Sequence, residues 1–248
     1  MNSEYSVARD PLFLAAVAVF AILTTIIPAF FGQAFLLIML QSVTLTILLG
    51  VALRTGSAGG ADAMGATLRM LVLWVLIQAL VIGWVAYAAG DRVDGAIRGG
   101  FDLSTSTLEW LYTDVAYPGT EQTTPVSRLI EFLAVTVGSY VSGGLIGIWT
   151  LLQTVNQTAF VSGKLLANLD QGVSVLVTFF PWSMLRIAAF IGFVALFAEP
   201  MWTGNWSPAR IWTQRRTLLL TSLGLLILAL LLEYMLPGPW RSLFVNTE

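Results

Sequence analysis

The chain has 248 residues, of which 57% are hydrophobic and 10% are charged, and its formal net charge is −2 at neutral pH. So little positive charge provides no basic surface for nucleic acid, which is therefore not an expected partner. Histidine and cysteine are both absent, which excludes disulfides, thiolate or imidazole metal sites and catalysis by a serine and histidine pair.

Six apolar stretches are each long enough to cross a bilayer, since about 20 helical residues match a hydrocarbon core about 30 Å thick. We predict membrane spans over residues 11–31, 34–53, 70–89, 129–151, 173–197 and 217–236. In lipid, only a helix pairs all its backbone N–H and C=O groups within one segment, without a partner strand. The expected fold is an all-α polytopic membrane helix bundle, a single domain over residues 1–248. Six spans would place both chain ends on the same side, and the arginine and lysine balance leaves the orientation open.

The loop over residues 90–128 contains a further helical pattern. Ser106 and Glu109 have the spacing of a capping box, and apolar residues recur at helical intervals from 108 to 115. Trp110 and Tyr112 would suit the headgroup layer. We predict a short interfacial helix here, which serves either as an anchor or as a docking site for a partner.

Small residues mark the fourth predicted span. Ser139, Gly143 and Gly147 recur every four residues and would form one face of a helix. Such a face lets a second helix backbone come close, so these residues predict tight helix packing. The alternative is that the glycines form a hinge or line a pore.

The fifth predicted span contains Pro181, which removes a backbone donor and predicts a helix break near Phe180 and Pro181. Arg186 follows this break, and Glu233 lies near the end of the last span. Because antiparallel neighbours place these positions on the same side, an intramembrane charge pair between Arg186 and Glu233 is predicted. It would be a structural clasp or part of a transport or gating site, and the alternative is that each side chain reaches the interface alone.

Further polar residues lie near the broken fifth helix. Gln153, Asn156, Gln157 and Lys164 could join the charge pair in a polar path near one membrane face. Discontinuous helices often mark substrate sites, so these residues support a second hypothesis, a transporter or permease subunit.

A glycine-rich run at 138–147 is followed by an asparagine element at 156–163, a proline that opens a helix at 181–186, and a glutamate with a later proline at 232–237. In the order and spacing of these elements, residues 130–240 resemble the SpoIIM-type (stage II sporulation protein M) membrane proteins. This chain departs from the family pattern at three positions, with Trp182 in place of histidine, Arg186 in place of glutamate and Gln157 in place of glycine. The resemblance implies a non-catalytic component of a complex in a prokaryotic cell membrane.

We therefore expect a non-catalytic integral membrane subunit that acts as a scaffold or assembly component. No predicted span contains an aspartate, so an aspartyl intramembrane protease is excluded, and we expect no catalytic residue, cofactor or metal. The expected partners are the lipid bilayer and other membrane proteins, with a second copy of the chain left open.

Overall fold

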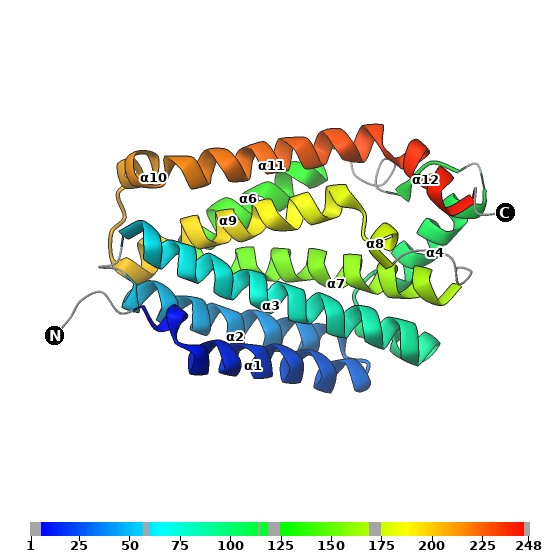
Figure 1. The fold of residues 1–248 in the computed structure, drawn as a ribbon, viewed down its shortest axis with the longest axis horizontal. Coiled ribbons are helices and arrows are strands. Elements are labelled where there is room, and N and C mark those ends of the chain that lie inside the picture. Colours follow the sequence, from blue (N-terminus) through cyan, green and yellow to red (C-terminus); the bar gives the residue numbers. More distant parts are fainter. Residues whose placement is uncertain (1–5, 57–59, 114, 119–124, 169–174, 246–248) are drawn as a thin grey trace.

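The computed structural model describes residues 6–56, 60–113, 115–118, 125–168 and 175–245, and these residues form helices and connections without a strand among them (Figure 1). The long helices are α1 (Pro11–Phe30), α2 (Ala34–Thr55), α3 (Gly60–Ala89), α6 (Pro125–Ser142), α7 (Leu145–Asn168), α9 (Pro181–Thr203) and α11 (Arg216–Met235). The shorter elements are η1 (Val7–Arg9), η2 (Gly90–Ala96), α4 (Gly100–Tyr112), α8 (Val175–Thr178), α10 (Pro208–Gln214) and α12 (Pro237–Val245).

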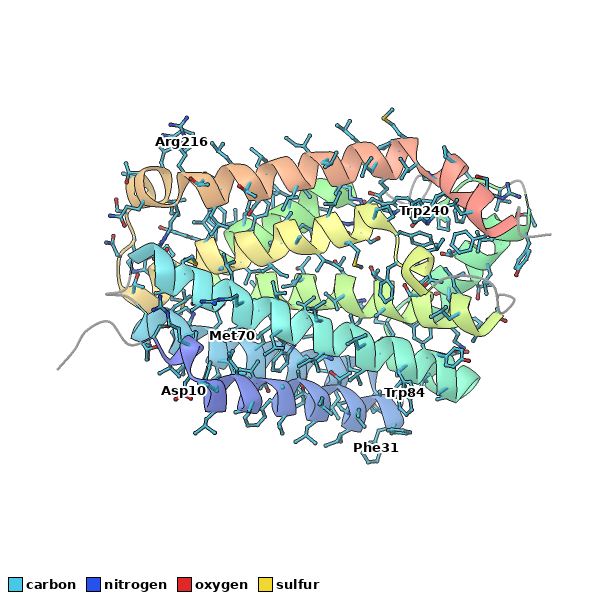
Figure 2. All side chains as sticks on the ribbon, in the orientation of Figure 1. Asp10, Phe31, Met70, Trp84, Arg216 and Trp240 are labelled. Carbon is cyan, nitrogen blue, oxygen red and sulfur yellow. The ribbon has the colours of Figure 1, made fainter. Side chains whose placement is uncertain are left out.

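Five of the described helices, α1, α2, α3, α9 and α11, are long and apolar enough to cross a membrane. Large apolar side chains project outward along α1 and α11 (Figure 2). Leu12 is 80% exposed and Leu80 is 69% exposed, although both lie in strongly apolar helices. A surface that exposes so much apolar area suits contact with lipid, because a monomer in water rarely leaves large contiguous apolar patches uncovered.

The prediction of one helix over residues 129–151 is wrong. The chain reverses at Gly143 and Gly144, whose φ angles of 62° and 104° lie in the region that favours glycine, and this turn separates α6 from α7. Gly144 N donates to Ser139 O at 2.9 Å and closes the end of α6. The continuous apolar run at 129–151 therefore forms a tight helical hairpin and not one helix.

Helix α7 occupies the centre of the bundle. It packs against α2, α3, α4, α6 and α9, so most of its surface faces protein. Thirteen of its residues are buried. This enclosure allows α7 to carry amide and charged side chains that would be costly in contact with lipid.

The long helices run alternately in opposite directions, and the hairpin places two helices, α6 and α7, where the sequence predicts one span. Asp10, just before α1, and Trp240 in α12 consequently lie near opposite ends of the bundle (Figure 2). Six spans would place both chain ends at the same end of the bundle, whereas α1 begins at one end and α12 lies at the other (Figure 1).

A cap of short elements covers the end of the bundle that carries the C-terminus, where α4, α8 and α12 gather (Figure 1). The helix expected within residues 90–128 is present as α4, but it begins at Gly100, and Ser106 lies in its interior rather than at its start. Ser106 Oγ donates to Asp102 O at 2.7 Å, so the capping box is not formed. Trp110 is buried against the bundle, whereas Tyr112 is 65% exposed.

Helices α3 and α7 approach each other closely at two glycines, Gly83 and Gly163. A Cβ atom built on Gly163 would overlap the carbonyl oxygen of Gly83, and it would lie 2.8 Å from the Cβ of Ala86. The absence of side chains at these two glycines therefore brings the two backbones into contact.

Candidate functional site

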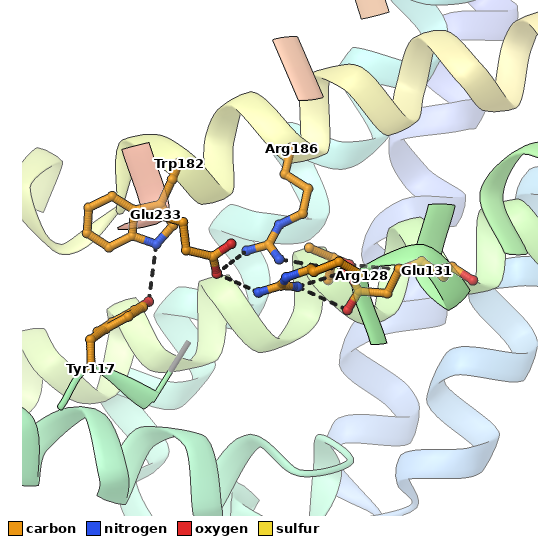
Figure 3. Close-up of polar contacts among 8 residues, drawn as sticks. Tyr117, Arg128, Glu131, Trp182, Arg186 and Glu233 are labelled. Carbon is orange, nitrogen blue, oxygen red and sulfur yellow. Dashed lines mark hydrogen bonds and ion pairs between the residues drawn. The ribbon is translucent and has the colours of Figure 1, made fainter. Parts of the chain in front are cut away.

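Four charged side chains meet near one end of the bundle, and we call them the charge cluster: Arg128, Glu131, Arg186 and Glu233 (Figure 3). They come from the start of α6, the start of α9 and the end of α11. Two arginines face two carboxylates, so the cluster as a whole is neutral.

Glu233 is the centre of this cluster. Its Oε1 accepts hydrogen bonds from Arg128 Nη2 at 2.5 Å and from Arg186 Nη2 at 3.4 Å. Arg128 Nη1 also donates to Glu131 Oε2 at 2.9 Å, and Arg186 Nη1 lies 3.8 Å from the same oxygen. Charges of opposite sign therefore alternate around the cluster.

The local sequence places these groups. Pro181 is the first residue of α9 and Phe180 before it is extended, so the helix break predicted at this position is present. Arg186 lies five residues into α9 and Glu233 lies two residues before the end of α11, while α9 and α11 pack side by side. At a rise of about 1.5 Å per residue, both charges lie within about 8 Å of their helix ends.

Burial makes the pairing necessary. Arg186 is 7% exposed and Glu233 is 4% exposed. A buried charge that loses its partner destabilises a protein by about 3–5 kcal/mol, because the remaining charge is left uncompensated. The cluster therefore ties α6, α9 and α11 together at this end.

The two guanidinium groups have donors to spare. Two arginines carry ten N–H donors, whereas their hydrogen bonds to the described residues are four, all to Glu131 and Glu233. Arg128 Nε and Arg186 Nε are buried and have no hydrogen-bond partner among the described residues. Each charge in the cluster therefore has a partner of opposite sign, whereas some N–H donors of the two arginines have no acceptor among the described residues.

Aromatic rings surround the helix break beside the cluster. Phe180 and Trp182 stack with ring centroids 5.0 Å apart, and Trp182 Nε1 donates to the Tyr117 hydroxyl at 3.2 Å (Figure 3). Trp240 Nε1 donates to Val177 O at 3.1 Å and joins α12 to this group. Burial raises the pKa of Tyr117 above its ordinary value, so the phenol remains neutral.

Two cavities meet at the charge cluster. The first, which we call the apolar crevice, has a volume of about 400 Å³ and lies between α6 and α11 over Phe190 of α9. Besides the cluster it is lined by Leu129, Phe132, Phe190, Leu223, Leu226, Ile227, Leu230 and Tyr234. The second, which we call the polar pocket, has a volume of about 410 Å³. Besides the cluster it is lined by Gly99, Asp102, Leu103, Tyr117, Pro118, Ser127, Thr154, Gln157, Thr158 and Ser183.

The residues expected to form a polar path are dispersed among separate contacts. Gln157 lines the polar pocket, where its Nε2 donates to Arg98 O at 3.2 Å, and Gln153 donates to the same carbonyl at 2.9 Å. Lys164 forms an ion pair of 2.6 Å with Asp94 of η2. Asn156 points away from the polar pocket, toward α2 and α3. Of the polar path residues, only Gln157 reaches the cavity that Arg186 and Glu233 line.

Asn156 instead belongs to a buried amide network that the sequence analysis missed. Asn156 Nδ2 donates to Gln41 Oε1 at 3.0 Å, and Gln78 Nε2 donates to Asn156 Oδ1 at 2.6 Å. Gln41 Nε2 donates to Thr25 Oγ1 at 2.8 Å, and Trp74 Nε1 donates to Gln78 Oε1 at 2.7 Å. The network joins α1, α2, α3 and α7. The sequence contains one signal of this network, because Gln41 and Gln78 are the single glutamines of the apolar stretches 34–53 and 70–89.

The small residues of the fourth predicted span meet in a different way from the one expected. Ser139 on α6 faces Gly147 on α7, and a Cβ atom built on Gly147 would overlap Ser139 Oγ. Gly143 lies in the turn between the helices, where its carbonyl oxygen accepts from Trp202 Nε1 at 2.7 Å. The three residues therefore lie at the hairpin and not on one face of one helix.

Arg128 and Glu131 were also missed, because hydropathy assigns them to a loop edge and a helix end. A further ion pair, Arg215 Nη2 to Glu199 Oε1 at 2.9 Å, joins α9 to the residue before α11 at the opposite end of the bundle. No protein-family model matches the chain, and the searches of curated proteins and of solved structures also found no match.

Proposed function

We propose that this chain is a multi-pass membrane protein that works as a non-catalytic scaffold or assembly subunit of a membrane complex. The observation that carries the proposal is that its buried polar side chains form contacts between helices. The amide network joins four helices, and the charge cluster joins three others. A bundle tied together in this way is suited to holding a fixed shape for a partner.

The cap supplies the surface for that partner in this proposal. Helix α4 lies in the cap at one end of the bundle, packed on α7 and α12, with Tyr112, Asp102 and Glu109 exposed. A mixture of aromatic and acidic side chains at the end of the bundle gives a partner both apolar area and charge to recognise. The resemblance of residues 130–240 to SpoIIM-type proteins supports the same function class, and it alone motivates the proposal of a prokaryotic cell membrane.

A site-specific photo-crosslinking experiment tests the scaffold proposal. A photoreactive amino acid at Tyr112, on the exposed face of α4, should crosslink one defined protein in native membranes. The same probe at Leu80, on the outer face of α3, should crosslink lipid only. Equal protein crosslinking at both positions would contradict a specific partner surface on the cap.

One observation favours a second candidate, a transporter or permease subunit. The polar pocket lies directly beside the broken helix at Pro181 and is lined by charges of both signs. Transport substrates often bind where helices are interrupted. Flux of a polar solute into proteoliposomes containing the purified chain, reduced by Gln157→Leu, would support this candidate over the scaffold.

A further inference from the structure

The charge cluster is the shared wall of two cavities of opposite character. Arg128, Glu131, Arg186 and Glu233 line both the apolar crevice and the polar pocket. An apolar cavity on one side and a polar cavity on the other, separated by charged groups, match the two parts of an amphiphilic molecule.

The apolar crevice has the length of a lipid chain in one leaflet. Along α11 its lining runs from Leu223 to Glu233, which is about 15 Å of helix. A hydrocarbon core is about 30 Å thick, so the crevice covers about half of it. Ile227 is 51% exposed and Leu129 is 55% exposed, so the crevice opens on the outer surface of the bundle, where lipid would be.

The crevice also begins at the depth where a head group meets its chains. The charge cluster lies within about one and a half helical turns of the ends of α9 and α11, and the crevice extends from it toward the middle of the bundle. The polar pocket extends in the other direction, toward α4 and Pro118 in the cap. A lipid in the leaflet at this end of the bundle would place its acyl chain in the apolar crevice and its head group in the polar pocket.

The polar pocket favours a head group that carries both charges. Its lining contains the arginines of the cluster together with the carboxyl groups of Glu131, Glu233 and Asp102. The N–H donors that the guanidinium groups do not use are free to bind phosphate oxygens, which arginine recognises well. Asp102, on the opposite wall in α4, supplies a carboxylate for an ammonium group. Two guanidinium groups face three carboxylates in this lining, so a purely anionic head group would add to an excess of negative charge.

We propose that the cluster and its two cavities bind one phospholipid with a zwitterionic head group. One acyl chain lies in the apolar crevice between α6 and α11, the phosphate contacts Arg128 and Arg186, and the ammonium group contacts Asp102. This binding site goes beyond the scaffold function, and it stands whether or not a protein partner is found.

Native mass spectrometry of the delipidated full chain tests the proposal directly. The protein is titrated with phosphatidylethanolamine or with phosphatidylglycerol of the same acyl chains. We expect one phosphatidylethanolamine molecule to be retained with an affinity at least about tenfold higher than that of phosphatidylglycerol. Equal retention of the two lipids, or a preference for phosphatidylglycerol, would overturn the zwitterionic assignment.

Two pairs of variants locate the bound lipid. Ile227→Trp fills the crevice and should reduce phosphatidylethanolamine affinity about tenfold, whereas Leu231→Trp, exposed on α11 outside the crevice lining, should leave it unchanged. Asp102→Asn should remove the preference between the two lipids, whereas Glu109→Gln, exposed on the same helix, should preserve it. Equal effects within either pair would overturn the placement of the chain or of the ammonium group.

Discussion

Glu233 of α11 is held more closely by Arg128 of α6 than by Arg186 of α9. The contact with Arg128 Nη2 is 2.5 Å long and the contact with Arg186 Nη2 is 3.4 Å long. The sequence favours Arg186 as the partner, because α9 and α11 are neighbours along the chain. The structure adds a third helix, and the carboxylate of Glu233 therefore joins α6 to α9 and α11.

Substitution of Glu233→Gln should destabilise the bundle by about 3 kcal/mol, because two buried arginines lose a shared negative charge. Thermal unfolding in detergent measures this change, with Glu109→Gln as the exposed control. In double-mutant cycles the coupling of Glu233 to Arg128 should exceed its coupling to Arg186. Additive effects in both cycles would show that Glu233 is not paired in the folded protein.

The amide network makes a second prediction. Gln78→Leu should reduce stability by about 2 kcal/mol, because Gln41, Trp74 and Asn156 lose a partner in a buried position. Gln153→Leu is the matched control, since Gln153 is half-buried and its acceptor Arg98 O keeps the bond from Gln157. Chemical denaturation of both variants in detergent distinguishes them. A Gln78→Leu protein as stable as the control would mean that the network does not stabilise the fold.

Helix packing can be tested with alanine at two glycines. Gly163→Ala should destabilise the protein by about 1–3 kcal/mol, because the new methyl group meets the backbone of Gly83 on α3. Gly224→Ala places the same methyl group on α11 where nothing lies within 4 Å, and it should stabilise the helix by up to about 1 kcal/mol. Melting temperatures that shift in the same direction would contradict the close approach of α3 and α7.

The crossing number can be measured because the chain contains no cysteine. Single substitutions Arg9→Cys and Ser242→Cys introduce one thiol near each end of the bundle. Arg9 lies just before α1 and Ser242 lies in α12, and these helices begin and end at opposite ends of the bundle (Figure 1). A membrane-impermeant maleimide should therefore label the two thiols from opposite sides of sealed vesicles. Labelling of both from the same side would restore the even number of crossings that hydropathy predicts.

Hydropathy predicted the first two helices almost to the residue. The predicted ranges 11–31 and 34–53 correspond to α1 and α2, because lipid-facing helices must be apolar along their whole length. The same measure failed at 129–151, since a glycine turn between two apolar segments leaves hydropathy unchanged. Hydropathy also missed the length of α7, because this helix faces other helices rather than lipid and therefore carries polar residues.

The candidate site was predicted in part for a similar reason. Pro181, Arg186 and Glu233 are conspicuous in apolar stretches, and the structure brings both charges beside the helix break. Arg128 and Glu131 lie three residues apart at the start of α6, where charged residues are ordinary and carry no signal. Only the packing of α6 on α9 reveals that they complete the cluster.

The enclosure of α7 has a consequence for how such a chain would enter a membrane during synthesis. Its neighbours α2, α3 and α6 precede it in the sequence, but α9 follows it. Asn156 and Lys164 find their partners on α2, α3 and η2, all of which are made earlier. An insertion machinery would therefore meet α7 after those segments have been made, and the face that α9 covers would stay exposed until the ribosome had added the 35 residues from the end of α7 at Asn168 to the end of α9 at Thr203.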